Sequence, residues 1–340
     1  MENARKKERI DFVDIFRGLG ILLMVMGHIK FGDRFDHFIH GFHMPMFFFV
    51  SGYFYKKKNI SFGEFAVKKS RTLLVPYFVF GILQYGIWLY WNWEKSSEDK
   101  LQPLCNLLFK NTKDLPIAGA LWFLTALFLA DIIYFLLDRI VKNRILLSAI
   151  IAAIALWGTV AAKVMPFRLP WAMDAAFVGL GMYHIAQLMR CHMDNRFVNK
   201  LFHLKWYQWF AAGVICSILI FVNGYINMRR GDYAVIYLFW INAVGATLVG
   251  WNLARSMEEA AAHFGVIRAA AAWLKHIGRN SIVYVCLNQL VIMECKKYMR
   301  ELPMPDLALR IVILVVVMCI LWILDYIIQN TALRVVTGKK

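Results

Sequence analysis

Ten stretches of mostly apolar residues, each about as long as a bilayer is thick, restrict what this chain can fold into. A helix needs about 20 such residues to cross the hydrocarbon core. We therefore expect an all-α polytopic membrane protein with about ten transmembrane helices, a single domain over residues 1–340 and no soluble domain. The segment 38–55 is rich in His and Gly, and 276–295 begins with polar residues, so eight or nine full spans are the alternative. The predicted spans are 12–30, 38–55, 72–92, 119–138, 145–163, 169–189, 206–226, 233–254, 276–295 and 308–330.

The composition is also that of a membrane protein. Hydrophobic residues make up 60% of the chain and the mean hydropathy is +0.53, whereas soluble proteins contain about 45–50% apolar residues. The formal net charge of +17 would suggest nucleic-acid binding in a soluble protein. Here the basic residues lie mostly in short loops between apolar runs, where they set topology and contact lipid headgroups. We therefore expect the lipid bilayer as a partner and no nucleic acid.

The distribution of basic residues predicts how the chain is oriented. With the N-terminus inside, the cytoplasmic loops and tails collect 24 Lys and Arg residues and the outer loops collect 14. An excess of Lys and Arg is typical of the cytoplasmic side. The first apolar run is too long for a signal-peptide core and lacks a small-residue cleavage site, so it is expected to stay as a transmembrane helix. We expect a multi-pass protein of the plasma membrane with both termini in the cytoplasm.

The cysteines do not indicate a metal centre or a disulfide framework. The chain contains six of them, scattered without the spacing of either kind of site. Several lie in or beside apolar runs, where cysteine behaves as a small hydrophobic residue. We expect no metal and no structural disulfide.

The first apolar run contains polar side chains at both ends, in the sequence RGLGILLMVMGH. A helical residue turns by about 100° and rises about 1.5 Å, so Arg17 and His28 share one face and lie about 16 Å apart. Asp14, three residues before Arg17, can pair with it at helical spacing. Ionisable groups inside a membrane usually face a polar cavity and serve function. The alternatives are that Arg17 snorkels to the cytoplasmic interface and that His28 is an interfacial ring.

The second run reads HFIHGFHMPMFFFVSGYF and carries three histidines. His40 and His43 are three residues apart, so both could face a cavity. They are weak as a metal pair, because zinc requires three or four ligands and no Cys or carboxylate stands at a matching spacing. Pro45 is expected to kink or restart the helix. Ser51 and Gly52 are more typical of close helix packing than of a nucleophile.

Several other polar residues lie in or near the later spans. Any of them could line a polar cavity, and none has a decisive partner in the sequence. They are Asp131, Asp174, Asn242, Ser281, Asn288, Gln289 and Glu294.

Together these segments resemble the acyltransferase 3 family of integral membrane acyltransferases, and most closely its fucose O-acetylase-like branch. The resemblance rests on RIDFVDIFRGLGILLMVMGH and FHMPMFFFVSGYF, with weaker support from RTLLVPY, LWFLTALF and GRNSIVYV, in family order along most of the chain. It implies about ten helices and transfer of an acyl group, typically acetyl from acetyl-CoA, to a hydroxyl of a cell-envelope sugar or polysaccharide. By motif match, the essential Arg and His of the family fall on Arg17 and His28. Many members have a His where this chain has Asn288, which leaves the role of that helix open.

The physical chemistry of the quoted residues suits such a reaction. A histidine titrates near neutral pH and can remove a proton from a hydroxyl, so we expect His28 to be the general base. Arg17, at the cytoplasmic edge, can hold the phosphates of CoA, with Asp14 orienting it and Arg71 as a second cofactor-binding candidate. His43 is expected on the acceptor or oxyanion side. The sequence does not decide whether His28 removes a proton or carries the acyl group.

Two other classes of function remain as alternatives. A transporter or flippase for a glycan or organic anion would move its substrate without consuming acetyl-CoA, and such proteins often contain a repeat of spans. No clear repeat is visible here. A non-catalytic membrane subunit or sensor would tolerate the loss of His28. The order of the Arg, the His and the FHMP segment favours the enzyme.

Overall fold

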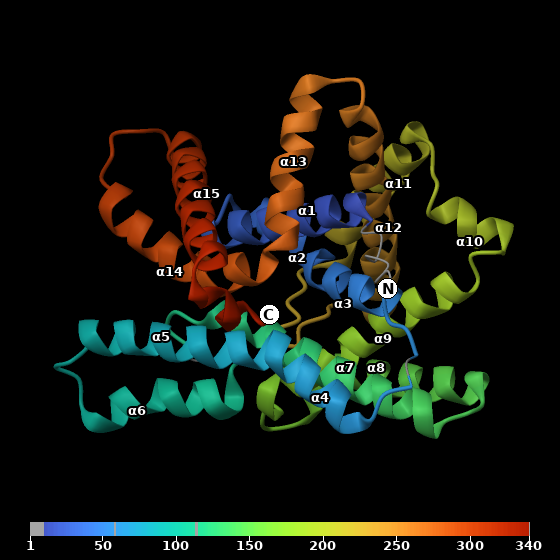
Figure 1. The fold of residues 1–340 in the computed structure, drawn as a ribbon, viewed down its shortest axis with the longest axis horizontal. Helices are drawn as coiled ribbons and strands as arrows, with labels where there is room; N and C mark the ends of the chain where they lie inside the picture. Colours follow the sequence, from blue (N-terminus) through green and yellow to red (C-terminus); the bar gives the residue numbers. More distant parts are fainter. Residues whose placement is uncertain (1–9, 58, 113–114, 340) are drawn as a thin grey trace, which may run out of the picture.

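The computed structural model describes residues 10–57, 59–112 and 115–339, and these residues fold into helices without a β-strand (Figure 1). The α-helices are α1 (Asp11–Ile29), α2 (Asp33–His40), α3 (His43–Tyr53), α4 (Phe62–Lys69), α5 (Val75–Trp91), α6 (Ser97–Cys105), α7 (Trp122–Ile140), α8 (Arg144–Val164), α9 (Met173–Cys191), α10 (Arg196–Leu201), α11 (Trp206–Asn223), α12 (Ile236–Ala261), α13 (Gly265–Arg279), α14 (Ser281–Met299) and α15 (Asp306–Asn330). Short π-helical turns are η1 (Ser70–Leu74) and η2 (Asn106–Lys110), and short 3₁₀ turns are η3 (Gly119–Leu121), η4 (Pro170–Ala172) and η5 (Ala332–Thr337).

Seven helical segments of the described chain are long and apolar enough to cross a membrane. This confirms the predicted all-α polytopic membrane fold. The seven segments cover Asp11–Ile29, Phe62–Trp91, Gly119–Ile140, Arg144–Val164, Trp206–Asn223, Ile236–Ala261 and Asp306–Asn330. The other three predicted spans correspond to α9, to α14 and to the pair α2 and α3. Helices α2 and α3 are 8 and 11 residues long, too short to span alone, and α9 and α14 contain buried polar side chains such as Asp174 and Asn288.

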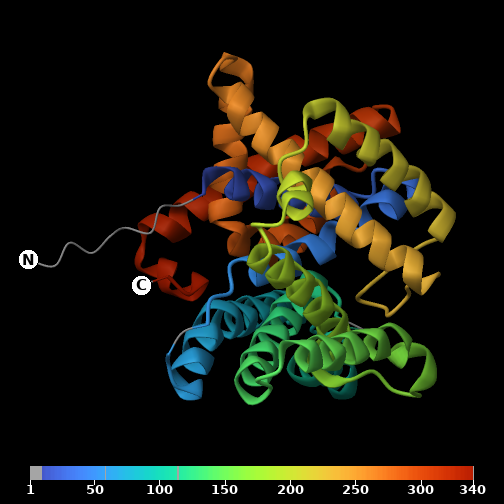
Figure 2. The same ribbon diagram turned by 90° about the vertical axis from the view of Figure 1, so that its right-hand side faces the viewer.

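Helix α1 lies among the C-terminal helices. Figures 1 and 2 show α5 to α8 together on one side of the molecule and α1 with α12, α13 and α15 on the other, with α3 between the two groups. Helix α1 packs most extensively on α13 and α12, and α3 packs on α9. The position of α1 therefore depends on packing against helices that come more than 200 residues later in the chain.

The predicted span 38–55 is divided into two helices. Helix α2 ends at His40, and α3 begins at His43 after two turn residues. Pro45 lies in the first turn of α3, where its missing N–H leaves no hydrogen bond unmade. The proline thus restarts the helix, and the break leaves two short helices, each with a histidine at the end next to the break.

Helix α13 was not expected from the sequence as a separate element. Its buried residues Ala271, Leu274, Ile277 and Gly278 recur at helical spacing and face α1. The two helices approach so closely that a Cβ on Gly278 would lie 1.9 Å from the carbonyl oxygen of Asp14. A Cβ on Gly18 would likewise lie 2.2 Å from the carbonyl oxygen of Leu274. Only glycine at these two positions allows the backbones to meet.

Replacing Gly278 by alanine should therefore destabilise the protein. The new methyl group has to push α13 away from α1, and overpacking of this kind costs about 1–3 kcal/mol. We expect a lower apparent melting temperature of the purified protein. The control is Gly265→Ala in the same helix, where nothing lies within 4 Å of the new Cβ. Equal melting temperatures for the two variants would contradict the close approach.

Candidate functional site

A cavity of about 1310 Å³ opens at the end of α1 that carries His28. Its walls come from the last turn of α1, from α2 and the first turns of α3, from Thr112 and the segment 115–123, from the loop 225–230 and from α14. All three histidines of the first two predicted spans, His28, His40 and His43, line it. Segments far apart in sequence thus converge on one polar space.

Gln289 fixes the environment of the His28 ring. The side-chain oxygen of Gln289 accepts a hydrogen bond of 3.0 Å from the backbone N–H of Ala120. Its amide nitrogen therefore faces the Nδ1 atom of His28, at 3.5 Å. An amide nitrogen can only donate, so it favours the tautomer of neutral His28 with the proton on Nε2. At this distance the contact is long for a hydrogen bond.

His43 is held in the opposite tautomer. Its Nδ1–H donates to the carbonyl oxygen of Ile39 at 2.7 Å, and the side chain is buried. The neutral ring therefore has its lone pair on Nε2. The ring of His40 lies edge-on to it, with 5.0 Å between the ring centroids. Of the two cavity imidazoles with fixed partners, His28 is arranged as a donor and His43 as an acceptor.

Asp14 and Arg17 lie at the opposite end of α1. Asp14 is buried, with its side chain only 2% exposed, and its carboxylate accepts from the guanidinium of Arg279 at 3.1 Å. Arg17 lies 3.6 Å from the same carboxylate and 6.0 Å from the centre of the Phe54 ring. Arg17 does not line the cavity. The structure thus brings Asp14 and Arg17 together and separates them from the histidines by the length of the helix.

A second guanidinium group lies close to this end of α1. Arg190 donates to the carbonyl oxygen of Tyr53 at 2.6 Å and lies over the Tyr53 ring at 5.6 Å. The rings of Tyr53 and Phe54 are 5.2 Å apart. Arg17 and Arg190 therefore lie on two adjacent aromatic rings. Cations beside aromatic faces are groups that could hold a nucleotide through its phosphates and its base.

Arg71, the other predicted cofactor-binding residue, contacts a different part of the chain. It lies in the π-helical turn η1, just before Pro76, and its Nε–H donates to the carbonyl oxygen of Gly338 at 3.2 Å. This hydrogen bond holds the C-terminal turn in place and does not involve Arg17.

Helix α14 contributes two polar residues to the cavity, Gln289, which was one of several polar candidates in the sequence, and Lys296, which the sequence analysis did not name. Asn288 donates to the carbonyl oxygens of Tyr284 and Val285 in its own helix and does not line the cavity. Its neighbour Gln289 does line it, together with Lys296 one helical repeat later. A spacing of seven residues, about two turns, places two side chains on one face of a helix. This spacing could have indicated from the sequence that Lys296 faces the same cavity as Gln289.

Lys296 lies just beyond the predicted span 276–295 and is half-buried. Its Nζ donates to the carbonyl oxygen of His28 at 3.4 Å. Burial lowers the pKa of Lys296, and the like charges of Lys30 and Arg310 lower it further.

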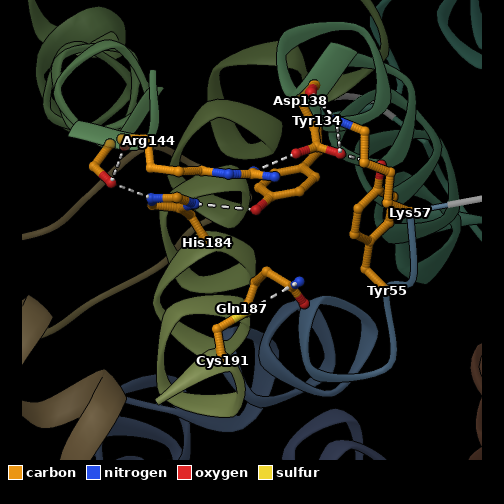
Figure 3. A network of polar contacts seen from close by, with 9 residues as sticks. Tyr55, Lys57, Tyr134, Asp138, Arg144, His184, Gln187 and Cys191 are labelled. Carbon is orange, nitrogen blue, oxygen red and sulfur yellow. Dashed lines mark hydrogen bonds and ion pairs between the residues drawn. The ribbon is translucent and has the colours of Figure 1, made fainter. Parts of the chain in front are cut away.

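A separate polar network joins α7, α8, α9 and the segment after α3 (Figure 3). Tyr55 and Arg144 bind the two oxygens of the buried Asp138. His184 accepts from the Tyr134 hydroxyl at 3.1 Å and contacts the Ser148 hydroxyl at 2.9 Å. None of the residues drawn lines the cavity. The network satisfies buried polar groups and holds three helices together. Among the described residues, no group of three or more His, Cys, Asp or Glu side chains could hold a metal ion.

Comparison with known proteins identifies a family. The model of the acyltransferase 3 family, described as "Acyltransferase domain", matches residues 10–326. No curated protein and no solved structure matches the chain significantly.

The buried carboxylate of Asp14 should be important for stability. Asp14→Asn removes the charge that pairs with Arg17 and Arg279. We expect a loss of about 1–3 kcal/mol, less than the 3–5 kcal/mol of a fully buried pair, because both arginines are partly exposed. Thermal unfolding of the purified protein measures it. Glu259→Gln, which removes an exposed pair with Arg255, is the control and should have almost no effect; an equally small effect of Asp14→Asn would contradict this role.

Proposed function

The chain belongs to the acyltransferase 3 family, and from this premise we propose that it transfers acetyl from acetyl-CoA to a hydroxyl of a cell-envelope sugar or polysaccharide. Family membership makes it a membrane acyltransferase. The observation that carries the finer proposal is the pair of cavity histidines held in opposite tautomers. Acyl transfer to a hydroxyl needs one group that takes a proton and one that stabilises negative charge. We place the chain in the fucose O-acetylase-like branch on its motifs alone.

His43 is the proposed general base. The lone pair on its Nε2 can accept the proton of the acceptor hydroxyl while Nδ1–H stays bound to Ile39. The hydroxyl oxygen then forms the new ester bond to the acetyl carbon as the bond from that carbon to sulfur breaks. The proton held by His43 passes to the leaving thiolate.

His28 is the proposed donor to the developing oxyanion. With Gln289 beside Nδ1, the proton of His28 is on Nε2. The expectation from the sequence, His28 as the base, requires the amide of Gln289 to move away from Nδ1. The two assignments therefore give Gln289 different roles. If His28 is the donor, Gln289 fixes its tautomer; if His28 is the base, Gln289 has to leave Nδ1.

The Arg17 end of α1 is the proposed binding site for the CoA nucleotide. Arg17 and Arg190 supply charge for the phosphates, Tyr53 and Phe54 supply faces for the base, and Asp14 orients Arg17. Arg71 remains a second candidate at this end of the molecule. The distance to His28, about 16 Å along the helix, suits a donor with a long flexible arm. Met46 and Phe47 pack against Gly20 between the two ends, so their side chains have to move when the acetyl group passes.

Replacing His28 or His43 should strongly reduce transfer without removing the protein from the membrane. We expect kcat to fall by about 10²–10⁴ for His43→Gln and by about 10²–10³ for His28→Gln, measured as labelled acetyl transferred from acetyl-CoA. His37→Gln is the control, because His37 binds the carbonyl oxygen of Ile220 and does not line the cavity. Normal transfer by His43→Gln would end the proposal. Movement of glycan without acetyl-CoA consumption would support a transporter instead.

The Gln289→Leu variant separates the two assignments of the base. If His28 is the donor, leucine removes the group that fixes its tautomer, and kcat should fall at least tenfold, about 1.4 kcal/mol in barrier height. If His28 uses Nδ1 as the base, leucine frees that atom and the rate should not fall. An unchanged or higher rate in the purified variant would therefore contradict our assignment.

The proposed orientation places both termini in the cytoplasm and the cavity on the outer side of the plasma membrane. Two exposed cysteines test it: Cys105 at the end of α6, expected outside, and Cys191 at the end of α9, expected inside. In intact cells, an impermeant maleimide should label a variant that retains only Cys105 and leave one that retains only Cys191 unlabelled. The opposite pattern would reverse the orientation.

A further inference from the structure

We propose that Lys296 is a site of self-acetylation, whose side-chain amine takes the acetyl group from a thioester bound in the cavity when no hydroxyl acceptor is present. This inference rests on the proposed function, because it assigns a second acceptor to the acetyl group that is delivered to that cavity. Lys296 lines the same cavity as His28 and His43.

Helix α14 directs Lys296 toward His28. The residues of α14 that line the cavity recur at the spacing of one helix face and are Val285, Gln289, Ile292, Met293 and Lys296. A helical side chain leans toward the N-terminus of its helix, which for Lys296 is the direction of Gln289. The Nζ atom of Lys296 lies 3.4 Å from the carbonyl oxygen of His28, and the amide nitrogen of Gln289 lies 3.5 Å from the ring of the same histidine. The amine therefore lies beside the imidazole that we assign to the oxyanion.

The surroundings of Lys296 favour its neutral form. Burial lowers the pKa of its amine, and the like charges of Lys30 and Arg310 lower it further. A lysine that is desolvated or placed next to another cation is activated as a nucleophile, because the neutral amine carries the reactive lone pair. The hydrogen bond to the carbonyl oxygen of His28 uses an N–H bond, so it leaves that lone pair available.

The reaction needs only the amine and the acetyl thioester. The lone pair of Nζ forms a bond to the acetyl carbon, and the bond from that carbon to sulfur breaks with its electron pair on sulfur. One proton of Nζ passes to the thiolate, which leaves as a free thiol. His28, as the proposed donor, stabilises the oxyanion as it does in transfer to a sugar. The product is an amide, which is more stable than a thioester or an ester, so the acetyl group stays on Lys296.

Two other lysines separate the effect of burial from that of position. Lys30 also lines the cavity, but its side chain is exposed. Lys297 follows Lys296 in α14, is exposed and does not line the cavity. Acetylation that is governed by exposure would modify these two residues first. Acetylation inside the cavity by an activated amine would modify Lys296 first.

Mass spectrometry of the full-length protein tests the inference. The protein in nanodiscs is incubated with acetyl-CoA that carries a ¹³C-labelled acetyl group, without a glycan. Cleavage after Glu294 and Glu301 releases Lys296 and Lys297 in one peptide, and fragmentation of that peptide locates the label. We expect about tenfold or more label on Lys296 than on Lys297 or Lys30, because a donor held in the cavity raises the effective concentration of the acetyl group and burial favours the neutral amine.

A matched pair of variants confirms the site. Lys296→Arg keeps the positive charge and stays protonated, so the label in this peptide should be lost. Lys297→Arg is the control and should leave the label on Lys296 unchanged. Equal labelling of Lys296 and Lys297 in the unmodified chain, or a label that persists in the peptide of Lys296→Arg, would overturn the inference.

A second donor distinguishes failure of this inference from failure of the proposed function. S-acetyl-N-acetylcysteamine is a small acetyl thioester that needs no nucleotide site to reach the cavity. Labelling of Lys296 by this thioester and not by acetyl-CoA would refute the proposed delivery from CoA and leave the inference standing. Acetylation of a glycan with no label on Lys296 from either donor would refute the inference and leave the proposed function standing.

Discussion

The structure depends on the pairing of one buried carboxylate, that of Asp14, with arginines from two helices. An unpaired charge at this depth would cost several kcal/mol. Pairing with Arg279 ties α1 to α13, and pairing with Arg17 holds that side chain at the end of α1. The two helices can meet there because Gly18 and Gly278 have no side chains. This joint sets the position of α1 and hence the place of His28 in the cavity wall.

The same helix connects two sites of different chemistry. At one end, guanidinium groups lie on aromatic rings, and at the other, imidazoles and amides line a polar cavity. The proposed reaction uses both ends, with the nucleotide of the donor at the first and the acceptor at the second. A membrane enzyme whose substrates lie on opposite sides of the bilayer needs such a separation. The apolar residues of α1 between the two ends set its length.

Much of this arrangement could be predicted from α1 alone. The apolar run identified a spanning helix, and counting turns placed Arg17 and His28 on one face at opposite ends. The break before Pro45 was also expected from the geometry of proline. These features depend on local sequence, and local rules of helix geometry are sufficient to predict them.

The rest depends on tertiary contacts that a local pattern does not contain. Gln289 lies at the cavity because α14 packs beside α1, although the sequence drew attention equally to Asn288. The pairing of Asp14 with Arg279 joins residues 265 positions apart. The tautomers of His28 and His43 follow from hydrogen bonds to Gln289 and Ile39, and only the structure shows these partners.

The central claim is that the cavity acetylates an envelope glycan, and mass spectrometry of envelope glycans tests it most directly. Glycans from cells that carry the gene would be compared with those from cells that lack it and from cells that carry only His43→Gln. The account predicts that the mass increment of one acetyl group is present with the intact gene and lost in both other strains. An identical glycan mass profile in all three strains would contradict it.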